Sequence, residues 1–166
     1  MDNSSVSQIE EIIDRIRYAL QNRFPHEISQ TYFGDIINYL PSAFVGENKR
    51  LSAVVAVAPD FDHAIDGERV GAHESRWVNV QINVLVNISA DFEAAPTEAF
   101  GERRLVRLVD QIRNYLTLQV NEDLEGLVAH TKIGDIDWTW AIKPDQALRI
   151  AVISFLVRIR VRRDGL

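Results

Sequence analysis

The clearest element of the sequence is a stretch of alternating apolar and polar positions between Arg76 and Ile88. Its even positions are apolar and its odd positions are mostly amides: Val78, Val80, Ile82, Val84, Val86 and Ile88 against Asn79, Gln81, Asn83 and Asn87. An alternation of period two over thirteen residues predicts a β-strand with one buried and one wetted face.

Three more stretches predict strands. A valine-rich run extends from Leu51 to Ala58 and is expected to stop at Pro59. In a later strand, one face carries Ile136, Trp138, Trp140 and Ile142, and the other carries Asp135, Asp137 and Thr139. A turn at 143–146, in which Pro144 pre-sets the first central position, leads into a last strand from Ala147 to Arg163.

Helical spacing marks two segments. In the first, Ser7 and Glu10 fit a capping box, so we expect the helix to start at Ser7 after a flexible stretch over 1–6. Its apolar stripe consists of Ile9, Ile12, Ile13, Ile16 and Leu20. The second helix is expected from Thr97 or Glu98 to Leu118, with a buried stripe that consists of Leu105, Leu108, Val109, Ile112 and Leu116.

The order of these elements predicts the fold class. Helix, strand, strand, helix, strand, strand indicates an α+β protein, and the 166 residues fit one domain, 1–166. We expect a four-stranded antiparallel sheet with two helices packed on one face and long hairpins extending toward neighbouring subunits. Residues 59–75 are expected to form a long hairpin loop, and residues 28–46 an irregular, partly buried connection.

Composition and charge narrow the classes of function. The chain has no cysteine, which excludes a disulfide framework, thiolate metal sites and a cysteine nucleophile. The formal net charge of -6 disfavours binding to nucleic acid or anionic lipid. The first residues lack the features of a signal peptide, and no stretch approaches the ~20 apolar residues that span a bilayer. Because nucleotide-binding, hydrolase and metalloprotease motifs are absent, we expect a protein without enzymatic activity, catalytic or metal-binding residues, or a cofactor.

Two strands are long for a chain of this size. Strands usually have ~5–6 residues, and at ~3.3 Å per residue a strand of thirteen extends to about 43 Å. A compact domain of this length has a radius of gyration of only ~15 Å. The middle of the last strand is also apolar on both faces, so its second face needs a cover, either another subunit or segment 28–46 of the same chain. We favour another subunit.

Arginines line one face of the last strand. Arg158, Arg160 and Arg162 occupy every second position, and Arg149 lies earlier in the strand. Three interpretations stay open for this row: a solvated strand end facing acids of the adjacent strand, an interface with acids of the next subunit, or a surface facing DNA in a channel. We assign these arginines, Arg149 included, to a subunit interface or to the lumen of a ring.

The polar loop is the second candidate for contacts. It contains Asp60, Asp62, His63, Asp66, Glu68, Arg69 and His73. Some of these residues could ligate a metal, but a flexible hairpin tip presents no fixed geometry, so we interpret them as a contact surface for a partner protein. Trp138 and Trp140, on the apolar face of their strand, are expected in the core.

The element order resembles that of a known family. An amphipathic N-terminal helix precedes an apolar, proline-containing segment (Leu40-Pro41-Ser42-Ala43-Phe44-Val45). A long hairpin, a single helix (Glu102 to Leu116), a Trp-bearing strand and a final long strand follow. From about Gln8 to Arg163 this is similar to the tail terminator, or tail completion, proteins of tailed bacteriophages. Another phage neck, connector or head-completion subunit of similar fold is the alternative.

The resemblance implies an architectural function in the virion. Such proteins form a homohexameric ring on the head-proximal end of the tail tube, where the ring ends tube polymerisation and joins the tail to the neck. The implied partners are copies of the chain, the tail tube protein, a neck or connector protein and, in contractile tails, the sheath protein. DNA passes through the channel without specific binding, and the loop at 59–75 would contact the tube or the neck.

Overall fold

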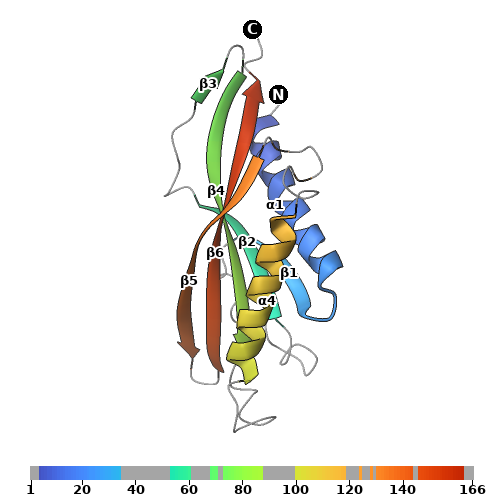
Figure 1. Cartoon of the computed structure of the whole chain (residues 1–166), viewed down its shortest axis with the longest axis vertical. Helices are drawn as coiled ribbons and strands as arrows, with labels where there is room; N and C mark the ends of the chain where they lie inside the picture. Colours follow the sequence, from blue (N-terminus) through green and yellow to red (C-terminus); the bar gives the residue numbers. More distant parts are fainter. Residues whose placement is uncertain are drawn as a thin grey trace.

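The chain forms two helices and six strands in a computed structural model that describes residues 4–34, 53–60, 68–70, 73–87, 100–118, 124, 128, 130–143 and 146–162. The helices are α1 (Ser4–Arg23) and α4 (Phe100–Leu116). The strands are β1 (Ile28–Phe33), β2 (Ala53–Asp60), β3 (Glu68–Val70), β4 (His73–Asn87), β5 (His130–Lys143) and β6 (Gln146–Arg162). The α+β class is confirmed (Figure 1). No helix in these ranges is long and apolar enough to cross a membrane.

The strands form one mixed sheet in the order β1-β2-β4-β6-β5, and the short β3 pairs with β4. The prediction of a four-stranded antiparallel sheet is therefore wrong, because β1 adds a strand that lies parallel to β2. This strand begins the segment that was expected to be an irregular connection, 28–46. Its buried positions, Ile28 and Thr31, lie three residues apart, so the sequence showed no alternation of period two that would predict a strand.

Strand β2 continues through Pro59 to Asp60, where the sequence predicted a stop and the start of a loop. Pro59 faces Val80 of β4, whereas the pairing with β1 ends at Val57. Beyond Val57 the other side of β2 has no strand partner among the described residues, and a proline without an N–H is tolerated on such an edge. The predicted loop 59–75 is further shortened by β3 and by the start of β4 at His73.

Both helices pack on the same face of the sheet, as predicted (Figure 1). One core cluster joins α1, the predicted stripe of α4 and alternate residues of the strands, among them Ile82 of β4 and Phe155 of β6. Phe155 is fully buried, which contributes on the order of 1.5–3 kcal/mol of transfer free energy. Helix α1 begins at Ser4 instead of Ser7, so Ser4–Val6 belong to the helix and the predicted capping box does not mark its start.

The face of the sheet opposite the helices, called the far face below, is not wetted along β4 as the amide positions predicted. Asn79 is only 7% and Asn83 only 5% exposed. A second apolar cluster lies on this face, and Tyr32 of β1 packs against it: Val54, Ala56, Leu85, Leu148 and Ile150. The first residues of β6 are thus buried on both faces within the chain, since Leu148 and Ile150 belong to this cluster, whereas Val152 and Leu156 further along are half-buried.

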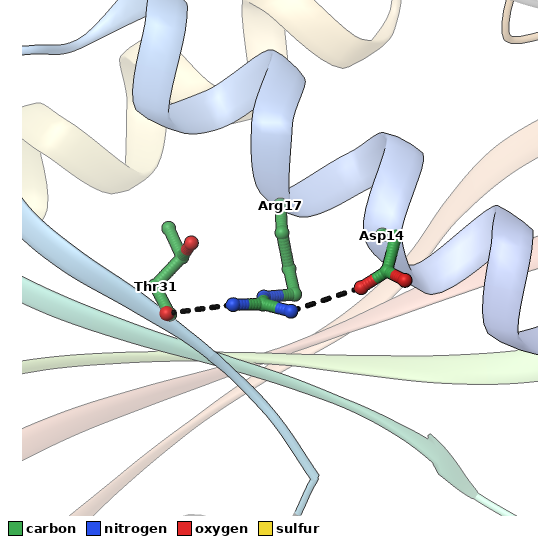
Figure 2. A network of polar contacts seen from close by, with 3 residues as sticks. All are labelled: Asp14, Arg17 and Thr31. Carbon is green, nitrogen blue, oxygen red and sulfur yellow. Dashed lines mark hydrogen bonds and ion pairs between the residues drawn. The ribbon is translucent and has the colours of Figure 1, made fainter.

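Side chains of α1 close one edge of the sheet. Arg17 reaches from the helix to β1, where its Nη2 donates to the backbone carbonyl of Thr31 at 3.0 Å, while its Nη1 donates to Asp14 Oδ1 at 2.9 Å (Figure 2). Four residues further along the helix, Gln21 Nε2 donates to the carbonyl of Ile28 at 2.8 Å. The edge strand β1 therefore has two of its carbonyl groups satisfied by side chains of the same chain.

Candidate interaction surface

Strand β5 forms the other edge of the sheet, and it lies outside the main helix contacts. Its register runs along β6 alone, from His130↔Arg158 to Lys143↔Gln146. Helix α1 packs mainly on β1 and β2, and helix α4 packs on β4 and β6. The strongly twisted sheet carries the β5–β6 hairpin to the end opposite β3 (Figure 1). This geometry leaves much of β5 open to solvent.

Two tryptophans of β5 are exposed as a consequence. Trp138 pairs with Ala151 and Trp140 with Arg149, so both lie on the helix face of the sheet, as their alternation predicted. Nevertheless Trp138 is 41% and Trp140 46% exposed, and the expectation that they lie in the core is wrong. The sequence gives the face of a strand residue, but whether a helix extends far enough to cover that residue depends on tertiary packing.

Arg149 belongs to this tryptophan surface and not to the arginine row. Its guanidinium carbon lies 4.4 Å from the centroid of the Trp140 ring, which is a cation–π geometry, and its Nη1 donates to the Thr139 carbonyl at 3.3 Å. Arg149 and Arg158 are nine residues apart on one strand, and residues an odd number apart point to opposite faces. The prediction grouped Arg149 with the row, and the register separates them.

The arginine row lies at the other end of β6, on the far face. Directly opposite Arg158, Arg160 and Arg162 on β4 are Trp77, Ser75 and His73, and opposite Arg158 on β5 is His130. None of these directly paired positions holds a carboxylate, and the three interpretations of the row remain predictions. Trp77 makes an edge-on contact with His130 (6.0 Å between ring centroids), and Lys132 Nζ lies 5.9 Å from the Trp77 ring centroid.

The predicted contact loop is only partly described. Glu68 and Arg69 lie in β3 and His73 begins β4, so these residues form a hairpin whose register joins the arginine row: Glu68 pairs with Ser75, which pairs with Arg160. Asp62, His63 and Asp66 lie outside the described residues. The structure thus brings the arginine row and one part of the predicted loop to the same end of the sheet (Figure 1).

Asp60 is buried and hydrogen-bonded, although it was expected to be an exposed contact residue. Its carboxylate is at the end of β2, and its residue is 9% exposed. Asp60 Oδ2 accepts hydrogen bonds from Asn79 Nδ2 and Gln81 Nε2, both at 3.0 Å. A buried carboxylate with two donors stabilises the junction of β2 and β4, because such groups cost free energy unless they are hydrogen-bonded. Its assignment as a contact residue remains a prediction without support from its position.

Two hollows of the described surface lie beside α4. One cavity of about 280 Å³ lies between the end of α1 and α4, where Arg23 stacks near the rings of Phe24 and Tyr115 at 5.5 and 5.9 Å. Another, of about 410 Å³, lies between the end of α4 and the start of β5, and Lys132 and Phe155 are among its lining residues. No group of three or more histidine, aspartate or glutamate residues in the described ranges could hold a metal ion.

Comparisons with known proteins add no family assignment. No family model matches the chain, and no curated protein matches it with significance.

Proposed function

We propose that this chain is a structural, non-catalytic subunit of a ring that closes the head-proximal end of a phage tail tube, ends its polymerisation and joins the tail to the neck. The observation that carries the proposal is the β4–β6–β5 ribbon, which exceeds its own helices in length and exposes two tryptophans on its edge strand. Such a surface is costly on an isolated subunit and useful in an assembly.

The lengths of the elements support this proposal. Strands β4 and β6 have 15 and 17 residues and pair without interruption from His73↔Arg162 to Asn87↔Leu148. At ~3.3 Å per residue β4 extends to about 50 Å, whereas the 17-residue α4 extends to about 25 Å at ~1.5 Å per residue. One helix of this length cannot cover the whole of these strands, and the far-face residues of β6 at positions 152, 154, 156 and 158 are only half-buried.

The exposed tryptophans support the same proposal. Aromatic residues are enriched at the centres of protein interfaces, where Trp and Arg supply most of the binding energy. Trp138, Trp140 and Arg149 combine these residue types on one face of the hairpin. Together with an element order that resembles that of tail terminators, this surface favours an assembly subunit that contacts copies of itself, the tube protein and the neck, with DNA passing through the ring.

The test is co-expression with the tail tube protein of the same virus. We expect the chain alone, or together with tube protein, to reach a mass several-fold above 18.9 kDa. Electron microscopy of tubes labelled on this chain should place the label at one tube end, adjacent to the head. A chain that stays monomeric and never binds tube or neck proteins would contradict the proposal. A label elsewhere in the neck would favour another connector subunit.

A further inference from the structure

We propose that the far face of the β5–β6 hairpin is a contact between copies of this chain, in which the acidic end of one copy docks on the basic end of the next. The basic end comprises His130, Lys132 and Arg158, and the acidic end comprises Asp135 and Asp137. The sense of this contact, head to tail, rests on the proposed ring, because a ring needs two different surfaces on each subunit.

The basic end gathers positive groups around one tryptophan. Arg158 is directly opposite both Trp77 and His130, and Lys132 is exposed with its Nζ 5.9 Å from the centroid of the Trp77 ring. Arg160 and Arg162 continue the same alternation along β6. The ring of Trp77 offers cations at this end a polarisable surface.

The acidic end lies on the same face a short distance along β5. Asp137 pairs with Val152, and a bulge between Ile133 and Ile136 places Gly134 and Asp135 opposite Ser154. Both aspartates are exposed, and no hydrogen bond or ion pair joins their carboxylates to another side chain in the described part of the chain. Asp137 follows Lys132 by five positions, which corresponds to about 16 Å at ~3.3 Å per residue.

Apolar residues of β6 lie beside both ends. Leu156 pairs with Lys132 and Val152 with Asp137, both apolar residues are half-buried, and Ser154 lies between them on β6. Apolar side chains bordered by charged groups are the usual arrangement of a protein interface. Because the charges at the two ends are opposite, the surface is complementary to itself when two copies are displaced along the strand.

A second copy fits this surface better than a nucleic acid does. The formal net charge of -6 and the two exposed aspartates would repel a phosphate backbone. Exposed charge pairs contribute little free energy within a monomer, whereas pairs that become buried between two subunits contribute substantially and determine the register of the contact. The alternating charge therefore has a larger effect on association than on folding.

Reversal of the charges at one end at a time tests this contact. The acid-reversed variant carries Asp135→Lys with Asp137→Lys, and the base-reversed variant carries Lys132→Asp with Arg158→Asp. Sedimentation at several salt concentrations should show association at least about tenfold weaker in each variant than in the wild type. The matched controls, Glu10→Lys with Glu11→Lys and Arg103→Asp with Arg107→Asp, change exposed helix residues by the same net charge and should assemble normally.

Mixing the two reversed variants gives the decisive result. The acid-reversed chain carries cations at both ends and the base-reversed chain carries carboxylates at both ends, so an equimolar mixture should assemble with alternating subunits. The chain with all four changes should also recover assembly. This recovery would show that the acid-reversed and base-reversed variants do not fail to assemble because of misfolding. Either reversed variant assembling like the wild type, or a mixture that stays dissociated, overturns the inference.

The outcomes separate this inference from the proposed function. If the wild type and both reversed variants assemble equally well, the proposed ring stands, but it does not use this contact. If the wild type never assembles, both the proposed ring and the proposed contact are wrong. Loss of DNA binding in the base-reversed variant, with an unchanged assembly mass, would mean that the basic end faces DNA and would overturn the copy-to-copy contact.

Discussion

The two edge strands of the sheet, β1 and β5, differ in length and in how far other parts of the chain cover them. Strand β1 has 6 residues, and α1 lies beside it with Arg17 and Gln21 donating to its carbonyl groups. Strand β5 has 14 residues, projects beyond the main helix contacts, and exposes Trp138 and Trp140 on one face and Asp135 and Asp137 on the other. In the described part of the chain, the first edge (the closed edge) is covered by α1, and the second (the open edge) has no further strand beside it.

The difference shows which surface the fold leaves for other proteins. Proteins generally protect edge strands because unpaired edges recruit other chains. In this protein α1 protects the short edge strand β1, whereas the long edge strand β5 carries aromatic residues of the kind that protein interfaces favour. We infer that mutations at the closed edge act on folding, whereas mutations at the open edge act on association.

The largest expected effect is at the open edge. Replacing Trp138 and Trp140 together by serine should abolish assembly, because central tryptophans contribute about 2 kcal/mol or more each, which together weaken association by roughly a thousandfold. Thermal unfolding of the monomer should change little, since both side chains are already 41% and 46% exposed. The control is Tyr18→Ser on α1, an aromatic residue 64% exposed, which should assemble like the wild type. A double variant that retains the wild-type mass would contradict the assignment.

The next effect is at the closed edge. Arg17→Met should lower the free energy of unfolding by about 1–3 kcal/mol, because the Thr31 carbonyl and Asp14 lose a charged donor. Urea denaturation measures this loss. The matched control is Arg107→Met, an exposed arginine of α4, where we expect a change within about 0.5 kcal/mol. Equal effects of the two substitutions would show that Arg17 does not close the edge.

A smaller effect is expected at the bulge of β5. A Cβ atom at Gly134 would lie 3.1 Å from the Ser154 Cβ, so Gly134→Ala should cost about 1 kcal/mol of stability through a local displacement of the ribbon. Ser154→Ala keeps the Cβ atom and serves as the control, with little change expected. If Gly134→Ala stabilises the protein, the two strands adjust freely at this point and the open edge is less rigid than described.

The sequence predicted best those elements in which buried residues recur at regular spacing along a single helix or strand. The stripe of α4 and the strand at β4 were predicted correctly because each follows one repeat along its element, although the far face of β4 is buried and not wetted. Strand β1 was missed because its place in the sheet depends on a parallel pairing with β2 that no local pattern reveals. The burial of Asn79 and Asn83 was missed for a similar reason, since their hydrogen bonds and their cover come from other segments.

Only part of the candidate surface was singled out from the sequence: the four arginines were candidates, whereas Trp138 and Trp140 were expected in the core. The sequence could have separated Arg149 from Arg158, because an odd spacing on one strand already implies opposite faces. It could not reveal that Trp138 and Trp140 are exposed, since this depends on which strands α4 covers. Asp60 had the composition of a loop contact, but the extension of β2 through Pro59 buries it beside Asn79.

Hydrogen exchange at high and low protein concentration tests the difference between the two edges most directly. The account predicts that amides of β5 exchange at least about tenfold more slowly in the concentrated, assembled protein than in the diluted monomer, because another copy then covers this edge. Amides of β1, which α1 already covers, should exchange at the same rate in both samples. Exchange in β5 that does not change between the two concentrations would contradict the claim that the open edge is an assembly surface.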